Sequence, residues 1–475
     1  MKPRVLLYGL LLVLPVIAFA AAGLLYLQAR GIAPRALAPY IEKRASGHNP
    51  VIVAAGDWSA RTLLSLDRGQ GLRPAPGLVA GSGTHADAAA GEAVRAVSVL
   101  DEDGLRRALL QAEAGDVITI LPGTYRIHPQ PLAANRPGLP GRPVTVRAVA
   151  ANTVTLEFQV EEGIKVSAPY WRFENLRLQG VCRIDTDCEH AFHVVGPASH
   201  FAAVNNTIVD FNAHFKINGE AGRFPDYGNI EANTIRNTRP RQTSNPVTPI
   251  DLVSASHWTI RANVISDFVK AGGDQISFGA FAKGGGSDNV FERNIVWCER
   301  LLQGQPGQRV GLSLGGGGTL ASLCRDGRCI VEQEGATLRD NLVLGCSDAG
   351  IYLNSAAASK ILRNTVLDTA GIQVRYPTSS ANLQGNLIDG AIVARDGATV
   401  RAADNIETPM VYAYLGYHPV RAMFRDFAQL DLAWKNGAAP LREQDDQDSG
   451  ADLCGSPASK RYGAFADFSG CVAPP

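Results

Sequence analysis

Strand-like runs of apolar and polar residues dominate the middle of the chain, from about residue 115 to 405. Segments such as GDVITILPGTYRI and GRPVTVRAVA are rich in β-branched residues and are separated by glycine and proline turns, which is typical of β-strands. The segment DEDGLRRALLQAEA at 101–114 differs, because its apolar residues recur at helical spacing. It predicts a short amphipathic helix that caps the open end of the strands.

An asparagine followed by apolar residues recurs through this region, in contexts such as VNNTIV, RANVIS and LRNTVL. The repeats lie 22 to 47 residues apart, which is the period of a solenoid. We expect each asparagine to occupy a buried turn, to tolerate left-handed backbone geometry there, and to bond to the asparagine of the next coil. The members are Asn175, Asn206, Asn233, Asn263, Asn294, Asn341, Asn364 and Asn386.

Six-residue blocks lie upstream of these asparagines, for example AFHVVG at 191–196 and GIYLNS at 350–355. Their second and fourth positions are apolar and face the core, whereas the third is polar and faces solvent. Stacked coils would align the third positions in a ladder with a spacing of about 4.8 Å. The expected ladder is Lys165, His193, Lys216, Asp251, Ala282, Ser313, Tyr352 and Gln373. The chain is therefore predicted to be all-β, with a right-handed parallel β-helix over residues 96–405.

The N-terminal residues 1–28 carry Lys2 and Arg4 before an apolar stretch that reaches about Gln28. This stretch is long enough to span a bilayer and favours an uncleaved signal-anchor, a transmembrane helix, over a cleaved signal peptide. Residues 29–95 are rich in Ala, Gly, Pro and Arg and are expected to form a periplasmic tether with some local structure. Residues 406–475 should form a C-terminal cap that shields the last coil.

The eight cysteines include three close pairs, which predicts disulfides and an oxidising compartment. The expected bridges are Cys182–Cys188, Cys324–Cys329 in an inserted hairpin, Cys454–Cys471 in the tail, and Cys298–Cys346 between neighbouring coils. The body would then face the periplasm or the extracellular space, and would be secreted if the N-terminal segment is cleaved. The formal net charge is zero, which argues against a nucleic-acid partner, and we expect a monomer.

Three segments resemble a known family. AGDVITILPGTYRI, PGRPVTVRA and ISFGAFAKGGGSDNVFERN are similar to the first coil and the catalytic coil of the chondroitinase B and alginate lyase family, within the pectate-lyase-like β-helix superfamily. The tail DLCGSP…GAF also resembles the ending of many secreted β-helix proteins. The resemblance implies eliminative cleavage of an acidic, uronate-containing polysaccharide, with a lysine base, an arginine near the leaving oxygen, and often a calcium ion. The lysine of this sequence that corresponds is Lys283.

Lyase chemistry requires a base for the proton next to the carboxylate and positive charge for the developing enolate. We expect Lys283 or Lys216 to act as the base and His193 or Tyr352 to assist proton transfer. The side chains expected to contact the substrate are Arg309, Arg223, Asp251, Gln373 and Asn218, and Asp251 is also expected to hold a cation such as calcium. The alternative for each residue is an ordinary solvated side chain of an exposed strand.

Two departures from the family concern Lys283 and the coil after it. The next coil reads GLSLGGGG, where the family has an arginine, and the block pattern places Lys283 in an inward column. A charged lysine in a dry core would be costly, so we expect a bulge at the following glycines to turn it outward, rather than a neutral, functional lysine inside.

Two other functions fit the same ladder. A non-catalytic scaffold for an envelope polysaccharide would present amides and aromatics, such as Asn218, Tyr352, Asn354 and Gln373. A uronate epimerase needs an acid and a base on opposite sides of the sugar ring, and His193 with Lys216 or Tyr352 would supply them.

Overall fold

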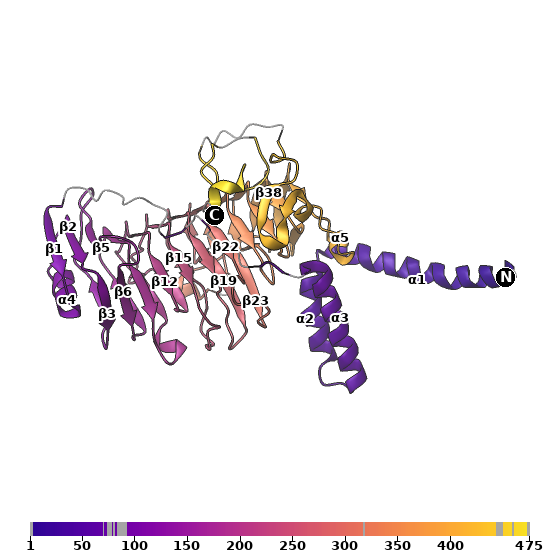
Figure 1. Cartoon of the computed structure of the whole chain (residues 1–475), viewed down its shortest axis with the longest axis horizontal. Coiled ribbons are helices and arrows are strands. Elements are labelled where there is room, and N and C mark those ends of the chain that lie inside the picture. Colours follow the sequence, from indigo (N-terminus) through magenta and orange to yellow (C-terminus); the bar gives the residue numbers. More distant parts are fainter. Residues whose placement is uncertain are drawn as a thin grey trace.

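The computed structural model describes residues 3–69, 71–73, 78, 81–82, 93–316, 319–442, 450–457 and 460–472. Its body is an elongated stack of coils (Figure 1). Within the described residues, the coils contribute strands to three parallel sheets of twelve, ten and eleven strands. The chain therefore folds as a parallel β-helix, as the asparagine repeat predicts.

The twelve-stranded sheet contains β1 (Arg95–Val99), β2 (Asp116–Ile120), β5 (Val144–Ala148), β8 (Trp171–Glu174), β11 (Ala202–Val204), β14 (Asn229–Glu231), β17 (Thr259–Arg261), β21 (Val290–Glu292), β25 (Thr337–Arg339), β29 (Ser359–Leu362), β32 (Ser380–Gln384) and β35 (Thr399–Ala402). The ten-stranded sheet contains β4 (Leu132–Ala134), β7 (Glu162–Val166), β10 (His190–Val195), β13 (Ala213–Asn218), β16 (Ile250–Val253), β19 (Ile276–Lys283), β23 (Gln308–Leu314), β27 (Ile351–Asn354), β31 (Ile372–Arg375) and β34 (Ile392–Arg395).

The eleven-stranded sheet contains β3 (Gly123–Ile127), β6 (Val154–Phe158), β9 (Arg177–Gly180), β12 (Thr207–Val209), β15 (Thr234–Arg236), β18 (Val264–Ser266), β22 (Ile295–Trp297), β26 (Leu342–Leu344), β30 (Thr365–Leu367), β33 (Leu387–Ile388) and β36 (Ile406–Glu407). Three short strands, β20 (Gly286–Ser287), β24 (Gln333–Glu334) and β28 (Ala356–Ala357), pair at a corner between sheets. Strands of the three large sheets thus run from Arg95 to Glu407.

The expected helix at the first coil is present as α4 (Glu102–Leu110). The side chain of Asp101 caps its N-terminus by accepting a hydrogen bond from the Gly104 amide at 2.7 Å. Leu105 and Leu109 are buried in the β-helix core. The helix therefore contributes apolar surface to the first coil.

A column of buried asparagines runs along the stack. The Oδ1 atom of Asn263 accepts hydrogen bonds from the backbone amide and Nδ2 of Asn233, and Asn263 donates to Asn294 in the same way, at 2.9 to 3.1 Å. The pattern continues without a break from Asn206 to Asn405. Each amide thus satisfies polar groups that have no access to water.

Two details of this column differ from the expectation. Leu176, and not Asn175, occupies the first position, because the Leu176 amide donates to Asn206 Oδ1. The left-handed backbone falls on the residue before each asparagine, such as Ala232 and Ala262, and not on the asparagine itself. The asparagine is therefore selected for its amide bonds and not for its backbone conformation.

The C-terminal cap packs on the side of the β-helix. After α5 (Met410–Tyr414), the hairpin of β37 (Phe424–Asp426) and β38 (Asp431–Trp434) lies with Phe465 and Phe468 against outward residues of the eleven-stranded sheet. This hairpin docks on the side of the β-helix, where apolar outward side chains such as Trp297 and Leu344 form the docking surface. The later tail contacts the last coil through Arg442 and Tyr462, which both bond to Asp404.

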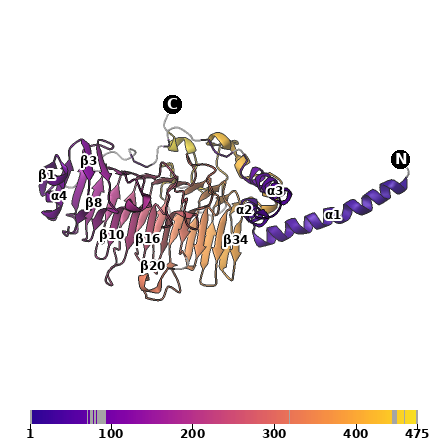
Figure 2. The ribbon, with the colours of Figure 1, turned by 90° about the horizontal axis from the view of Figure 1, so that it is seen from below.

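The segment expected to be a tether contains a helical hairpin, α2 (Pro34–Ala45) and α3 (Pro50–Arg68), near the last coils (Figures 1 and 2). Arg35 fixes this hairpin to the β-helix. Its guanidinium contacts Asp67 at 2.5 Å, Asp368 at 2.9 Å and the Cys346 carbonyl at 2.8 Å, and its side chain is 1% exposed. These buried contacts hold the hairpin in a defined position.

Helix α1 (Pro3–Arg30) covers the segment expected to anchor the chain, although residues 1–2 and the side chains of 3–13 lie outside the described part. Among the described residues, no single helix meets the length and apolarity required to cross a bilayer. Residues Ile17–Arg30 and Pro34–Ala45 meet the requirement only as a pair, with a bend of 110° between them.

All four expected disulfides are present. They join Cys182 to Cys188, Cys298 to Cys346, Cys324 to Cys329, and Cys454 to Cys471. The Cys298–Cys346 bridge spans a Cα separation of 4.9 Å, which is the distance between neighbouring coils.

Replacing Asn263 with alanine should destabilise the β-helix by about 3 kcal/mol, because it leaves the Asn233 amide and the Ile230 carbonyl buried without their partner. Denaturant unfolding monitored by circular dichroism measures the change. Asn382→Ala on the exposed face of β32 is the matched control and should change stability by less than about 0.5 kcal/mol. Equal effects of the two substitutions would contradict the role assigned to the column.

Candidate functional site

The outward face of the ten-stranded sheet aligns polar side chains from successive coils. Backbone pairing places Lys165 beside His193, His193 beside Lys216, and Lys216 beside Asp251. The same row continues through Phe281, Ser313, Tyr352 and Gln373. We call this face, with the next outward row that contains Asn218 and Lys283, the ladder face.

The alignment of β19 differs from the expectation by one residue. Phe281 pairs with Asp251 and takes the place expected for Ala282, whereas Ala280 and Ala282 are fully buried and face the core. Lys283 pairs with Val253 and faces outward, and its Nζ lies 4.4 Å from the centroid of the Phe281 ring. Lys283 therefore faces outward, as expected, but the inward column that the block pattern gave it is wrong. The register of β19 with β16 is continuous from Ala280 to Lys283, so no bulge turns the lysine outward. The sequence pattern was ambiguous because Phe281 is apolar and yet faces outward.

A polar cluster occupies the row at β7, β10, β13 and β16. Lys216 Nζ donates to Asp251 Oδ2 at 2.7 Å. His193 contacts Glu162 Oε1 through Nδ1 at 2.7 Å and Asn218 Oδ1 through Nε2 at 2.9 Å. The structure thus brings together four of the expected residues, and it adds Glu162, which the sequence analysis missed.

Both ring nitrogens of His193 lie close to side-chain oxygens. The amide of Asn218 is oriented by its Nδ2, which donates to the Gly219 carbonyl at 3.0 Å and leaves Oδ1 facing His193. Glu162 and Asn218 thus fix the orientation of the His193 ring from both sides. The same hydrogen bond from His193 lowers the pKa of Glu162, against the opposing effect of its partial burial.

His190 is a second histidine of this cluster that the sequence analysis missed. Its ring centroid lies 5.2 Å from that of His193. Burial, reinforced by His193 and Lys216, lowers the pKa of His190 to about 4. Its position three residues before His193 on β10 was the available signal. Burial thus disfavours a charge on His190, which lies beside His193.

Asp251 does not form a calcium site with its neighbours. It is 3% exposed, one carboxylate oxygen is paired with Lys216, and the other has no hydrogen-bond partner. Calcium requires six to eight oxygen ligands. Among the described residues, no group of three or more His, Cys, Asp or Glu side chains could hold a metal ion. These residues do not fit the cation that the family resemblance implies, and no step is assigned to it.

A second polar group lies further along the ladder face. Asn354 Nδ2 donates to the Tyr352 hydroxyl at 3.3 Å, and Arg395 donates to Gln373 Oε1 at 2.6 Å. Arg375 lies between Asn354 and Arg395 in the backbone register. Two arginines therefore extend the positive charge of the face toward the last coils.

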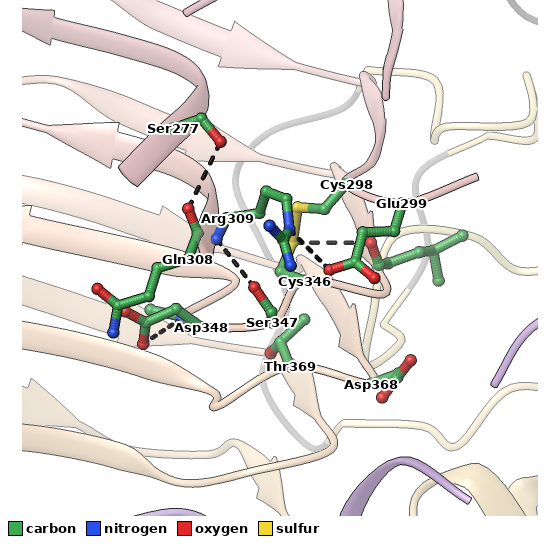
Figure 3. The surroundings of a disulfide bond; sticks show 12 residues. Ser277, Cys298, Glu299, Gln308, Arg309, Cys346, Ser347, Asp348, Asp368 and Thr369 are labelled. Carbon is green, nitrogen blue, oxygen red and sulfur yellow. Dashed lines mark hydrogen bonds and ion pairs between the residues drawn. A yellow bond between two sulfur atoms is a disulfide. The ribbon is translucent and has the colours of Figure 1, made fainter. Parts of the chain in front are cut away.

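The two arginines expected to bind substrate do not belong to the polar cluster. Arg309 is 2% exposed, and its guanidinium is held by Glu299 at 2.7 Å and by two backbone carbonyls next to the Cys298–Cys346 disulfide (Figure 3). It is therefore a buried structural residue and is not available to a substrate. Arg223 is exposed in the loop after β13, at the border of the ladder face.

An inserted loop borders the face beside Lys283. The amide of Arg325, between Cys324 and Cys329, donates to the Gly284 carbonyl at 2.8 Å. The Arg325 guanidinium reaches back to both carboxylate oxygens of Asp226, at 2.7 and 2.6 Å, and lies over the Phe224 ring. The disulfide-closed insertion thus forms a fixed wall on one side of Lys283.

One segment of the chain matches a known family. Residues 318–405 match the family described as periplasmic copper-binding protein (NosD). This segment is less than half of the chain. No curated protein sequence matches.

Solved structures share the fold. The pectate lyase Pel9A is 13% identical, with a TM-score of 0.52, and the match covers 82% of this chain and 98% of that one. A rhamnogalacturonan lyase matches with 12% identity, coverage of 79% and 97%, and a TM-score of 0.44. The mannuronan C-5 epimerase AlgE4 A-module of Azotobacter vinelandii matches with 13% identity, coverage of 66% and 93%, and a TM-score of 0.43. The match to Pel9A shows that the two chains share the parallel β-helix fold.

His190 should make the protein sensitive to acid. Its pKa is lowered from about 6.5 to about 4, so the unfolded chain takes up a proton that the folded chain rejects as the pH falls through this range. Relative to pH 7.5, the free energy of unfolding should fall by about 2 kcal/mol at pH 5 and by about 3 kcal/mol below pH 4 because of this histidine. In His190→Gln, the loss of stability between pH 7.5 and pH 5 should be smaller than in the natural protein by that amount.

Denaturant midpoints at the two pH values, with the exposed His48→Gln as control, measure this difference. An unchanged pH dependence in His190→Gln would contradict the assignment.

Proposed function

We propose that the ladder face binds an acidic polysaccharide and cleaves it by β-elimination. The observation that carries the proposal is the alignment in register of Lys165, His193, Lys216 and Asp251, with the outward Lys283 in the adjacent row. General bases and positive charges on one rigid face are the groups that elimination next to a carboxylate requires.

The charge of the face suits a uronate chain. Lys165, Lys216, Arg375 and Arg395 lie on strands β7 to β34 of one sheet. Three of them pair with the acidic side chains Glu162, Asp251 and Asp396, so a uronate carboxylate would share these cations or replace the acidic partner. Neighbouring strands are about 4.8 Å apart. Repeated carboxylates along a sugar chain would meet repeated cations along the solenoid.

Lys283 is the proposed base. It has no ion pair among the described residues, whereas Lys216 is held by Asp251. The neutral amine of Lys283 takes the proton from the carbon next to the uronate carboxylate and becomes an ammonium, and the electrons of that C–H bond form the carbon–carbon double bond. The bond to the glycosidic oxygen breaks, and that oxygen receives a proton from the Tyr352 hydroxyl. Lys216 and His193 lie two and three strands from Lys283, about 10 and 14 Å away, so they would contact neighbouring sugars of the same chain.

The segment that matches the copper-binding family contains none of the side chains that copper prefers in a free form. Residues 318–405 contain no histidine and no methionine, and Cys324, Cys329 and Cys346 are all in disulfides. Imidazole, thiolate and thioether are the ligands that copper prefers. We therefore carry no copper site over to this chain. The four disulfides are typical of a protein that works outside the cytosol.

Lys283→Ala should abolish formation of the unsaturated uronate product, which is detected by its ultraviolet absorbance, on a panel of alginate, pectate, chondroitin and heparinoid chains. The expected loss is at least about 100-fold, because a positioned base contributes that much. Lys360→Ala is the matched control, since Lys360 is exposed on β29 of the twelve-stranded sheet. Full activity in Lys283→Ala would contradict the role of this lysine.

The alternatives predict other products. A change in the uronate stereochemistry of the recovered chain, detected by nuclear magnetic resonance, would establish the epimerase, with His193 and Lys216 as the pair to substitute first. Binding without any chemical change would establish the scaffold. Absence of both binding and reaction across the panel would reject an acidic polysaccharide as the ligand.

A further inference from the structure

Helix α3 presents an apolar stripe that the rest of the described chain leaves uncovered. Val51 is 78% exposed and Trp58 is 66% exposed. With Ala55 between them, they recur at intervals of four and three residues and therefore share one side of the helix. The opposite side, with Gly56 and Ala60, packs against α2. A large aromatic side chain on an unpartnered helix face marks a contact surface.

The surroundings of the stripe are basic and apolar. Arg30, Lys43, Arg44 and Arg61 are exposed on α1, α2 and α3. The part of α1 that leads into the hairpin exposes large apolar side chains, namely Leu14, Ile17, Phe19, Leu25 and Tyr26. Apolar side chains with tryptophan on one helix face, beside basic residues, are typical of a helix that lies in the interface of a lipid bilayer.

The orientation of the helices fits one planar partner. Helix α1 projects away from the body, the hairpin runs across its direction, and α3 lies on the side toward which α1 projects (Figures 1 and 2). The bend between the end of α1 and α2 is 110°. A helix that enters a bilayer and a helix that lies flat on its surface are also roughly perpendicular to each other. A second copy of the chain would have to cover two apolar surfaces that point in different directions.

We propose that α3 lies on the surface of a lipid bilayer through Val51, Ala55 and Trp58. The buried contacts of Arg35 with Asp67 and Asp368 transmit this position to the β-helix. The last coils then face the membrane, and α4 and the first coil lie farthest from it (Figure 1). The ladder face runs along the axis between these ends, so it stands roughly perpendicular to the membrane plane. This inference does not rest on the proposed enzymatic function.

Tryptophan fluorescence tests the proposal directly. The chain has five tryptophans, and Trp171, Trp258, Trp297 and Trp434 are buried, which leaves Trp58 as the exposed reporter. The full-length protein is reconstituted in vesicles of phosphatidylcholine and phosphatidylglycerol that carry bromine atoms near the headgroups. Lipid bromines should quench the Trp58 signal, and the neutral aqueous quencher acrylamide should not reach it. Both effects should disappear in Trp58→Phe.

Val51→Asp provides a second variant that keeps the reporter. Val51 is exposed, so the substitution should leave the unfolding midpoint unchanged, and it should reduce lipid quenching and restore acrylamide quenching of Trp58. Trp58 that remains open to acrylamide and insensitive to lipid bromine overturns the proposal. Protection from acrylamide without lipid quenching, together with a dimer in size-exclusion chromatography, also overturns it and assigns the stripe to a second copy.

Discussion

The stacking of coils in strict register is the constraint on which the rest of this structure depends. Parallel backbone hydrogen bonds fix the coils about 4.8 Å apart, and the asparagine column from Asn206 to Asn405 secures the register at a buried turn in each coil. A slip of one residue would turn the ladder side chains inward. It would also separate Asn263 from both of its neighbours in the column. The same geometry that satisfies the core therefore creates the rows on the surface.

Features that arise from this repetition could be predicted from the sequence, whereas features that depend on single contacts could not. Ladder pairs such as His193 with Lys216 result from the block pattern, because identical spacing in successive coils implies register. The orientation of β19 was predicted wrongly, because the alternation of apolar and polar residues cannot distinguish an outward apolar residue such as Phe281 from a core residue. The burial of Arg309 by Glu299 and the lateral docking of the hairpin β37–β38 depend on contacts between segments that no local pattern encodes.

A buried ionic network joins the three parts of the chain. Arg35 of the helical hairpin shares Asp368 of the β-helix with Arg421 of the C-terminal cap, and Arg421 also contacts Asp389. Burial alone would raise the pKa of Asp389, but Arg421 and His418 hold it well below its usual value. A buried charge that loses its partner is strongly destabilising. Undocking any one of the three parts would leave such an unpaired charge in the other two. The helical hairpin, the β-helix and the cap thus behave as one unit near the last coils.

The three outer faces of the β-helix differ in what their side chains contact. The eleven-stranded sheet uses its outward apolar residues to bind the cap. The twelve-stranded sheet pairs its charges across strands, as in Arg261 with Glu231 and Arg339 with Glu292. On the ladder face, an oxygen of Asp251 and a nitrogen of His190 are buried without partners among the described residues. Buried polar atoms are expensive to leave unsatisfied. Such atoms occur on strands of all three sheets, because Arg147 Nε and Arg261 Nε in the twelve-stranded sheet and Trp297 Nε1 in the eleven-stranded sheet also lack partners among the described residues. The unsatisfied atoms therefore do not distinguish the ladder face, and what distinguishes it is the row of ionisable side chains that the register aligns.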